Sequence, residues 1–255
     1  MSRKRTTPLR DEAVAPGHCS IEERARILSA VPYFKGLSAQ ALSDVNRHFR
    51  AFDYPAGARI YHESELAEAL FLVAHGKVKL LQHSVSGEEV VLDLLSQGGL
   101  FGGLAVLGQR RYPQSALAQT TCCALAITPA DFRHLLRTYP EMALTVLDTV
   151  ARDLEAAHTT IREISTLPVE ARIALVLLRL ADRLGEADHG NDGILIQSPL
   201  SQQDLAAMVG STAETVSRVI SGLRRSGDIE TGRQWIRLRN RTNLARLANE
   251  AEPTN

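Results

Sequence analysis

The sequence predicts an α+β chain in which an antiparallel β-roll precedes a long helix and a winged pair of short helices. Between about Arg50 and Ile127, short apolar runs alternate with glycine-containing turns. From Pro140 to Leu167, apolar residues recur at heptad spacing, and after Ser201 a capped helix, a glycine and a second helix follow one another. We expect four regions: a loose tail over 1–24, the roll over 25–139, the long helix over 140–168 and the winged domain over 169–250.

The composition is that of an ordinary globular chain. Its 255 residues include 29 Lys and Arg against 29 Asp and Glu, and 44% are hydrophobic, which excludes wholesale disorder. No apolar run approaches the roughly 20 residues of a membrane helix, and the basic N-terminus lacks the apolar stretch of a secretory signal. Three cysteines, Cys19, Cys122 and Cys123, cannot make a disulfide framework. We therefore expect a cytoplasmic protein, with no membrane partner and with Cys122 and Cys123 as buried, inert thiols.

The roll is predicted from strand-like runs separated by turns. Two short helices, near Ile21–Val31 and Ser38–Phe49, come first, and Ser38 can cap the second. The strand-like runs are Ala58–His62, Leu70–Val73, Lys77–Leu80 and Val90–Leu95. Turn residues occur at Pro55–Gly57, His75–Gly76, Ser86–Gly87 and Gly98–Gly99. A spacing of about ten residues between turns is typical of an antiparallel roll or barrel.

The long helix carries one apolar seam. Its residues are Ala143, Leu147, Val150, Leu154, Ala157, Ile161 and Ile164, separated by alternating steps of four and three. Charged residues lie between them, and Pro168 ends the helix. Such a seam indicates either a dimerisation helix or a helix that packs on its own sheet; we expect the former.

The C-terminal helix pair has the pattern of a DNA-binding module. Ser201 is placed to cap a short helix with Asp204 at its third position, and Gly210 provides the turn. Ser211 or Thr212 then caps a second helix from Ala213 to about Arg225. Its apolar stripe is Val216, Val219, Ile220 and Leu223, which leaves Ala213, Glu214, Ser217 and Arg218 facing outward. A second helix so presented can enter a major groove, N-terminal residues first.

Arginine is concentrated around this helix pair. From Ser211 to Arg246 there are eight Arg and three acidic residues, a net of 8 − 3 = +5. A charge cluster alone could be a solvated surface, but here it accompanies a predicted wing, Ile229–Glu230 and Trp235–Leu238 around a turn at Gly232–Arg233. Arg can donate two hydrogen bonds to phosphate or guanine. The residues expected to contact DNA are Ser211, Thr212, Ala213, Glu214, Thr215, Ser217, Arg218, Arg224, Arg233 and Arg237.

From about residue 25 onward, this order of elements resembles the cyclic-AMP receptor protein / fumarate–nitrate regulator (CRP/FNR) transcription factors. The run Glu214-Thr-Val-Ser-Arg218 is similar to the Glu-x-x-Ser-Arg of the fumarate–nitrate branch. The resemblance implies a homodimer with a cyclic-nucleotide-binding-like effector roll. It also implies recognition of a palindrome with TTGAT-like half-sites and recruitment of RNA polymerase.

The same resemblance argues against cyclic AMP as the effector. Cyclic-AMP binders of the family carry Phe-Gly-Glu-Leu and Arg-Ser-Ala, whereas this chain has Phe101-Gly-Gly-Leu104 and Gln114-Ser-Ala116. The carboxylate for the ribose and the guanidinium for the phosphate are both missing, and Ala157-His158 replaces the Thr-Ser pair of the dimer helix. Arg110 or Arg111 could serve a phosphate instead. The candidate effector pocket comprises Gly102, Gly103, Leu104, Arg111, Gln114, Ser115 and His158.

The sequence also bears on two other cofactors, an iron–sulfur cluster and haem. Three cysteines are too few for an iron–sulfur cluster of the four-thiolate kind. The stretches Leu100–Gly108 and Tyr112–Ala118 resemble nitric-oxide-responsive denitrification regulators, some of which are thought to use haem. The possible haem ligands are His62, His75, His83 and His158. We expect a redox, nitric oxide or oxygen-limitation signal; the alternative is a ligand-free roll in a constitutive regulator.

An enzyme is the remote alternative. A cupin-like metal enzyme would need a His-x-His pair, which is absent, and no Walker, Gly-x-Ser-x-Gly or His-Glu-x-x-His motif occurs. We therefore predict neither a catalytic nor a metal site.

Overall fold

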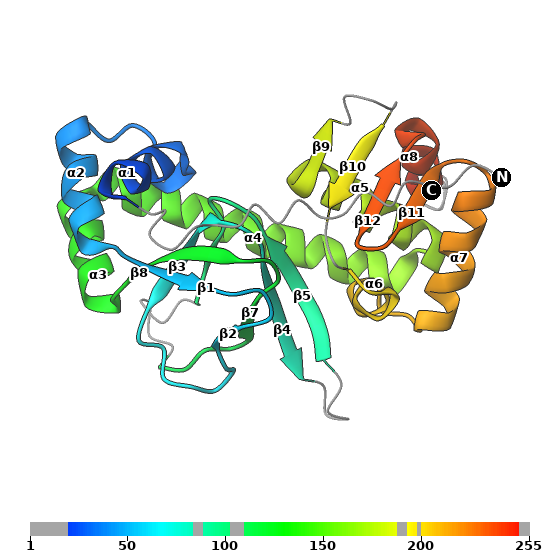
Figure 1. The fold of residues 1–255 in the computed structure, drawn as a ribbon, viewed down its shortest axis with the longest axis horizontal. Coiled ribbons are helices and arrows are strands. Elements are labelled where there is room, and N and C mark those ends of the chain that lie inside the picture. Colours follow the sequence, from blue (N-terminus) through cyan, green and yellow to red (C-terminus); the bar gives the residue numbers. More distant parts are fainter. Residues whose placement is uncertain (1–19, 84–88, 103–109, 188–192, 198–199, 250–255) are drawn as a thin grey trace. The chain divides into compact units, whose positions relative to one another are not determined.

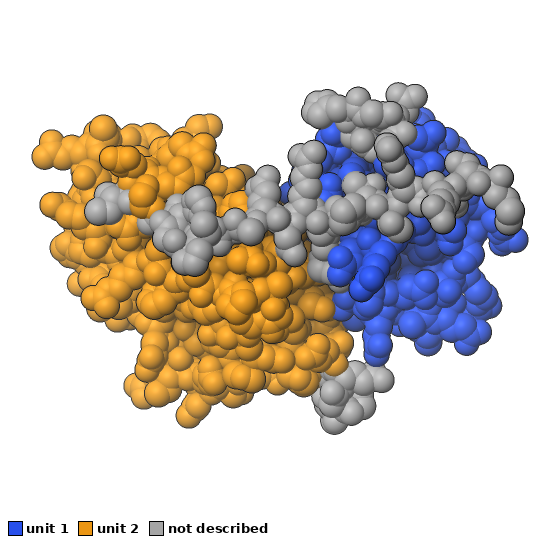
Figure 2. All heavy atoms as spheres, in the orientation of Figure 1, with its two compact units in different colours: residues 1–10, 156–255 blue, residues 11–155 orange. Residues whose placement is uncertain are grey.

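The computed structural model describes residues 20–83, 89–102, 110–187, 193–197 and 200–249. They form two compact units, one containing the described residues up to Glu155 and the other those from Ala156 onward (Figure 2). The boundary falls inside the long helix α4 (Pro140–Thr166), so this helix contributes to both units. No helix within the described ranges is long and apolar enough to cross a membrane.

The first unit is an antiparallel roll accompanied by short helices (Figure 1). Its helices are α1 (Ile21–Ala30), the 3-10 helix η1 (Pro32–Phe34), α2 (Ala39–His48) and α3 (Pro129–Thr138). Its strands are β1 (Arg50–Tyr54), β2 (Arg59–Tyr61), β3 (Leu70–His75), β4 (Val78–His83), β5 (Glu89–Leu95), β6 (Leu100–Phe101), β7 (Ser115–Ala118) and β8 (Cys122–Ile127). They make two four-stranded sheets, β1-β8-β3-β6 and β2-β7-β4-β5. The predicted roll, both N-terminal helices and the Ser38 cap are confirmed.

Strand β8 separates the two cores of this unit. Successive side chains of a strand point to opposite faces, and the two cysteines follow that rule. Cys123 is buried with the helix residues Phe34 and Phe49, whereas Cys122 is buried inside the roll with Tyr61. Cys122 is a free thiol, and burial raises its pKa to about 12. Cys123 is disulfide-bonded, so the expectation of two inert thiols holds for Cys122 alone.

Helix α4 leaves a row of large apolar side chains exposed. Near its start, Met142 is buried in the helical core of the first unit, which orients this end of the helix. The exposed residues are Leu144, Leu147, Leu154, Ile161 and Ile164, each between 42% and 63% accessible. This row retains four members of the predicted seam and adds Leu144. Of the other predicted seam residues, Ala157 is exposed and Ala143 and Val150 are half-exposed. The role of the seam in a dimer stays a prediction.

The second unit contains the winged helix pair (Figure 1). Its further helices are α5 (Val169–Leu184), α6 (Gln202–Val209), α7 (Ala213–Arg225) and α8 (Arg241–Asn249). Its strands are β9 (Gly185–Ala187), β10 (Ile194–Gln197), β11 (Ile229–Gly232) and β12 (Trp235–Leu238), in the order β11-β12-β10-β9. The fold class is therefore confirmed as a roll, a long helix and a C-terminal helix-turn-helix domain, with β9 and α8 added.

Candidate nucleic-acid interface

The first helix of the pair begins at a reciprocal cap. Ser201 Oγ accepts a hydrogen bond from the Asp204 amide at 3.0 Å, and Asp204 Oδ2 accepts one from the Ser201 amide at 2.8 Å. These bonds satisfy backbone donors that the first turn of a helix leaves unpaired. The apolar side chains of Leu205 and Val209 are buried beneath the helix. The predicted capping box thus fixes where α6 starts.

The turn after α6 depends on Gly210. Its φ of 60° is left-handed, a conformation that glycine adopts without the strain of a Cβ atom. The amide of Ser211 donates to the Ala206 carbonyl at 2.9 Å, which completes the turn. Thr212, one of the two predicted caps, then accepts from the Thr215 amide at 3.2 Å and starts α7.

Helix α7 buries one face and presents the other. Of the predicted apolar stripe, Val216, Ile220 and Leu223 are buried, whereas Val219 is only half-buried. On the outer face the side chains of Glu214 and Arg218 are 85% and 72% accessible.

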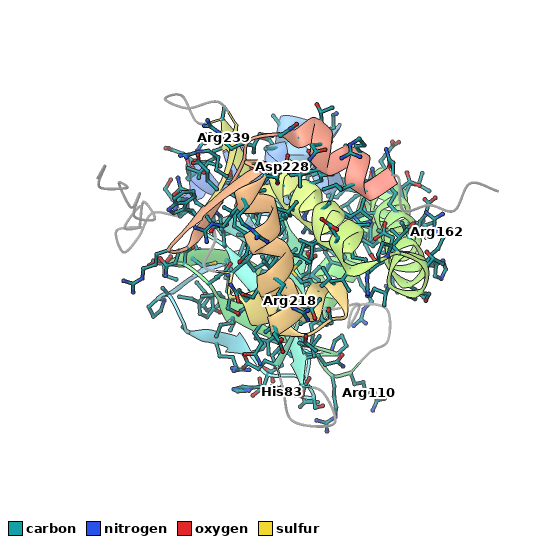
Figure 3. All side chains as sticks on the ribbon, turned by 90° about the vertical axis from the view of Figure 1, so that its right-hand side faces the viewer. His83, Arg110, Arg162, Arg218, Asp228 and Arg239 are labelled. Atoms are coloured by element: carbon teal, nitrogen blue, oxygen red, sulfur yellow. The ribbon has the colours of Figure 1, made fainter. Side chains whose placement is uncertain are left out.

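The outward residues of α7 are held only loosely. Figure 3 labels Arg218 on this helix. Its Nη2 lies 4.0 Å from Glu214 Oε1 and 3.4 Å from Thr215 Oγ1. Ser217, beside them, is half-buried, whereas Ser211 is half-exposed and Ala213 and Arg224 are exposed. These long contacts between exposed groups leave the guanidinium available to an acceptor such as guanine.

The wing supplies fewer surface cations than predicted. Its turn residue Arg233 is exposed, as expected. Arg237, by contrast, is 8% accessible, pairs with Glu230 directly across the hairpin and lies 5.1 Å over the Trp235 ring. The structure therefore contradicts Arg237 as a phosphate contact, because its buried guanidinium is already paired with the Glu230 carboxylate inside the wing.

A buried aspartate that the sequence reading missed joins α7, the wing and α8. Asp228 Oδ2 accepts from Ser226 Oγ at 2.5 Å, and Oδ1 accepts from Asn243 Nδ2 at 2.8 Å. Its carbonyl accepts from the amides of Arg239 and Asn240 at 2.8 and 3.1 Å. The Ser226-Gly227-Asp228 turn was the available signal, since Ser, Gly and Asp are typical turn residues. Asp228 stabilises the domain that carries α7.

Comparison with known proteins agrees with this geometry. A family model described as "Cyclic nucleotide-binding domain" matches residues 51–139, and one described as "Crp-like helix-turn-helix domain" matches residues 171–247. The chain is 32% identical over 217 residues to the "Cyclic AMP receptor protein" of Thermus thermophilus, covering 85% of this chain and 96% of that protein. The chain belongs to the CRP/FNR family of transcription regulators.

Further CRP/FNR relatives span most of the chain. The "CRP-like cAMP-activated global transcriptional regulator" of Mycobacterium tuberculosis is 26% identical, covering 86% of this chain and 93% of its own. The catabolite activator protein structure from Thermus thermophilus is 31% identical, with a TM-score of 0.50 over 86% of this chain and 99% of that one. FixK2 from Bradyrhizobium japonicum shares the fold, with a TM-score of 0.69 at 24% identity over 78% of this chain and 96% of that one. The chain is thus a DNA-binding regulator rather than an enzyme.

The residues predicted for a CRP/FNR effector pocket are distributed over both units. Gly102, Arg111, Gln114 and Ser115 lie in the first unit, whereas His158 lies in the second, and Gly103 and Leu104 are outside the described residues. Two of these polar side chains already bind the roll's own backbone. Arg111 Nη1 donates to the Ser64 carbonyl at 2.5 Å, and the buried Ser115 Oγ accepts from the Glu63 amide at 2.9 Å. Gln114, which stands where the resemblance expects an arginine, is half-buried.

Aromatic side chains fill the interior of the roll. The rings of Tyr61 and Tyr112 are stacked with centroids 3.8 Å apart, and Phe71 and Phe101 extend the stack at 5.2 to 6.1 Å. Tyr112 Oη donates to the Ala69 carbonyl at 3.0 Å, which holds the stack against the backbone. Burial raises the pKa of the Tyr61 phenol, which therefore stays neutral. Sequence reasoning missed this cluster.

The four histidines considered as haem ligands have different surroundings. His62 and His158 are exposed, His75 is half-buried, and His83 Nδ1 lies 3.1 Å from Glu63 Oε1. Across the described ranges, no group of three or more His, Cys, Asp or Glu residues is arranged to hold a metal ion.

Proposed function

We propose that the chain acts as a homodimer that reads an inverted repeat with TTGAT-like half-sites. The observation that carries this proposal is the exposure of Glu214 and Arg218 beside Ser217 on the first turns of α7. Arg218 can donate two hydrogen bonds to one guanine, and Glu214 can accept one from a cytosine amino group. Two such helices, one DNA turn or about 34 Å apart, would read the two half-sites.

The dimer would form along α4. Leu147, Leu154 and Ile161 are spaced by seven residues and are 57–63% accessible, so a second copy of the helix would cover a row of large apolar side chains. Regulators of this family act as dimers with RNA polymerase, and we propose the same assembly here.

For the effector, we propose a redox, nitric oxide or oxygen-limitation signal rather than cyclic AMP. Gln114 in place of arginine opposes a cyclic phosphate, and the resemblance of Leu100–Gly108 to nitric-oxide-responsive regulators supports the proposed signal. Haem is the cofactor that would serve it, with His62, His75, His83 or His158 as the ligand. The second candidate is a constitutive regulator, which the stacked Tyr61 and Tyr112 favour because they occupy the roll interior.

The test combines a spectrum with a DNA titration. Protein as isolated from cells is examined for a haem Soret band, and its binding to a labelled TTGAT inverted repeat is measured by fluorescence anisotropy. The titration is repeated with cyclic AMP, a nitric oxide donor and haem. A response to nitric oxide or haem supports a sensing roll, whereas tight binding unchanged by all three supports the constitutive regulator. Activation by cyclic AMP would contradict both.

A further inference from the structure

The last turn of α4 contacts two parts of the DNA-binding unit through neighbouring side chains. Glu163 is buried, and its carboxylate pairs with the guanidinium of Arg179 on α5. The next residue, Ile164, approaches the turn between α6 and α7: a Cβ atom added at Gly210 would lie 3.3 Å from Ile164 Cγ2. The end of the long helix therefore contacts both the supporting helix and the turn before the recognition helix.

Arg172 secures the same turn from the first turn of α5. Its Nη1 donates to the carbonyl oxygens of Val209 at 2.6 Å and Gly210 at 3.3 Å. The last carbonyls of a helix have no partner within it and lie at the negative end of its dipole, so a guanidinium is well suited to them. Arg172 thus joins the end of α6 to α5.

The division of the chain into compact units is consistent with these contacts. It assigns residues from Ala156 onward, including the last turns of α4, to the unit that holds α6 and α7 (Figure 2). The contacts of Glu163, Ile164 and Arg172 all lie inside this unit.

We propose that Glu163, Arg172 and Arg179 are positioning residues for DNA recognition. They fix the angle between the end of α4 and the α6–α7 pair without touching DNA. This inference rests on the proposed dimer, in which the two α4 helices would set the distance between the two recognition helices. An inverted repeat requires that distance to be constant, whereas a single half-site does not. Without these contacts the orientation of each helix pair relative to α4 would be fixed only on binding, which weakens simultaneous binding to the two half-sites.

The test compares a full inverted repeat with a single half-site. Arg179→Met removes the partner of the Glu163 carboxylate, and the exchange Glu163→Arg with Arg179→Glu restores the pair in reverse. Arg183→Gln, which removes an exposed cation from the same helix, is the matched control. Affinities are measured by fluorescence anisotropy at one salt concentration for the full site, the half-site and a full site with one added central base pair. Thermal melting of each variant is recorded alongside.

We expect Arg179→Met to weaken full-site binding by about fivefold or more, with less than about twofold change on the half-site. Arg179→Met should also reduce the preference for the full site over the full site with one added central base pair. The charge exchange should restore both the full-site affinity and this preference. Equal losses on full site and half-site would overturn the inference, because they indicate a merely structural role. If Arg179→Met does not fold, Arg172→Gln, rescued by Arg172→Lys, is tested in the same way.

The two proposals fail in different ways. If the unmodified chain shows no preference for the inverted repeat over the half-site, both the proposed dimer and this inference are overturned. If the unmodified chain prefers the inverted repeat and Arg179→Met keeps that preference and its spacing, the inference alone is overturned.

Discussion

Gly210 sets the geometry of the helix pair through its left-handed backbone. An alanine there would adopt φ near 60° and place its Cβ atom 3.3 Å from Ile164 Cγ2. We expect Gly210→Ala to lower the free energy of unfolding by about 1–2 kcal/mol. The measurement is urea denaturation followed by the fluorescence of Trp235, the single tryptophan, which lies in the same unit.

Gly222 provides the matched control. It lies inside α7, and a Cβ atom added there meets nothing within 4 Å. Gly222→Ala should therefore raise the free energy of unfolding by about 0.5–1 kcal/mol, because glycine is a poor helix residue. Equal effects of the two alanines would contradict the role given to the Gly210 backbone.

Cys122 is expected to be unreactive in the folded protein. Burial, followed by the nearby Asp53 charge, raises the pKa of its thiol to about 12, so at pH 8 only about one molecule in ten thousand carries the thiolate. Iodoacetamide at pH 8 should label Cys122 only after unfolding in guanidinium, as measured by peptide mass spectrometry. Fast labelling of the native protein would show instead that Cys122 is available for redox sensing.

Arg218 and Arg237 show what the sequence can and cannot reveal about single residues. Helical periodicity places Arg218 opposite the buried stripe of α7, and the structure agrees. The environment of Arg237 depends on the hairpin register, which sets it opposite Glu230. The hairpin turn falls at residues 233–234, one residue later than predicted. The predicted turn would have placed Glu230 opposite Trp235, so the sequence reading could not find this ion pair.

Among the elements, α4 carries the prediction about assembly. Leu154 is 57% accessible in the middle of its apolar row, so a charge there would be buried in the proposed dimer. We expect Leu154→Glu to sediment as a monomer at concentrations where the unmodified chain is a dimer. Ala156→Glu, an exposed position two residues along the same helix, should remain dimeric. A dimeric Leu154→Glu variant would place the subunit interface elsewhere.

The seam of α4 could be predicted only in part. Heptad spacing identified Leu147, Leu154 and Ile161, but the first turns carry a second apolar pattern that faces the helical core. Met142 belongs to that pattern, and Leu144 faces away from it. One sequence cannot separate two overlapping apolar faces, because the distinction depends on which other element packs against the helix.

The wing offers a test of electrostatic contact. Arg233→Gln should reduce the slope of log affinity against log salt by about one, because one phosphate contact is lost, while the sequence preference is unchanged. Arg237→Gln is the control. Because it removes a buried ion pair, we expect it to lower the free energy of unfolding and to leave the salt-dependence slope unchanged. Anisotropy titrations at several salt concentrations measure both. A slope reduced by Arg237→Gln alone would reverse these assignments.

At the scale of the whole molecule, local sequence patterns predicted the order of the roll, the long helix and the winged helix pair. They did not predict the aromatic packing inside the roll. The aromatic stack joins Tyr61, Phe71, Phe101 and Tyr112, which come from four separate places in the chain. Only the strand pairing, such as Phe71 opposite Phe101, brings them together. Strand register over such separations follows from the complete sheet and not from local spacing.

The central claim is that Arg218 reads a base in each half of an inverted repeat, and one comparison of DNA affinities tests it most directly. The unmodified chain and Arg218→Ala are titrated by fluorescence anisotropy against the TTGAT inverted repeat, the same duplex with the guanines of both half-sites replaced, and a scrambled duplex. We predict that Arg218→Ala loses about 1–3 kcal/mol on the inverted repeat and no longer distinguishes the guanine replacement. An equal loss on the scrambled duplex, or no preference for the inverted repeat by the unmodified chain, would contradict the account.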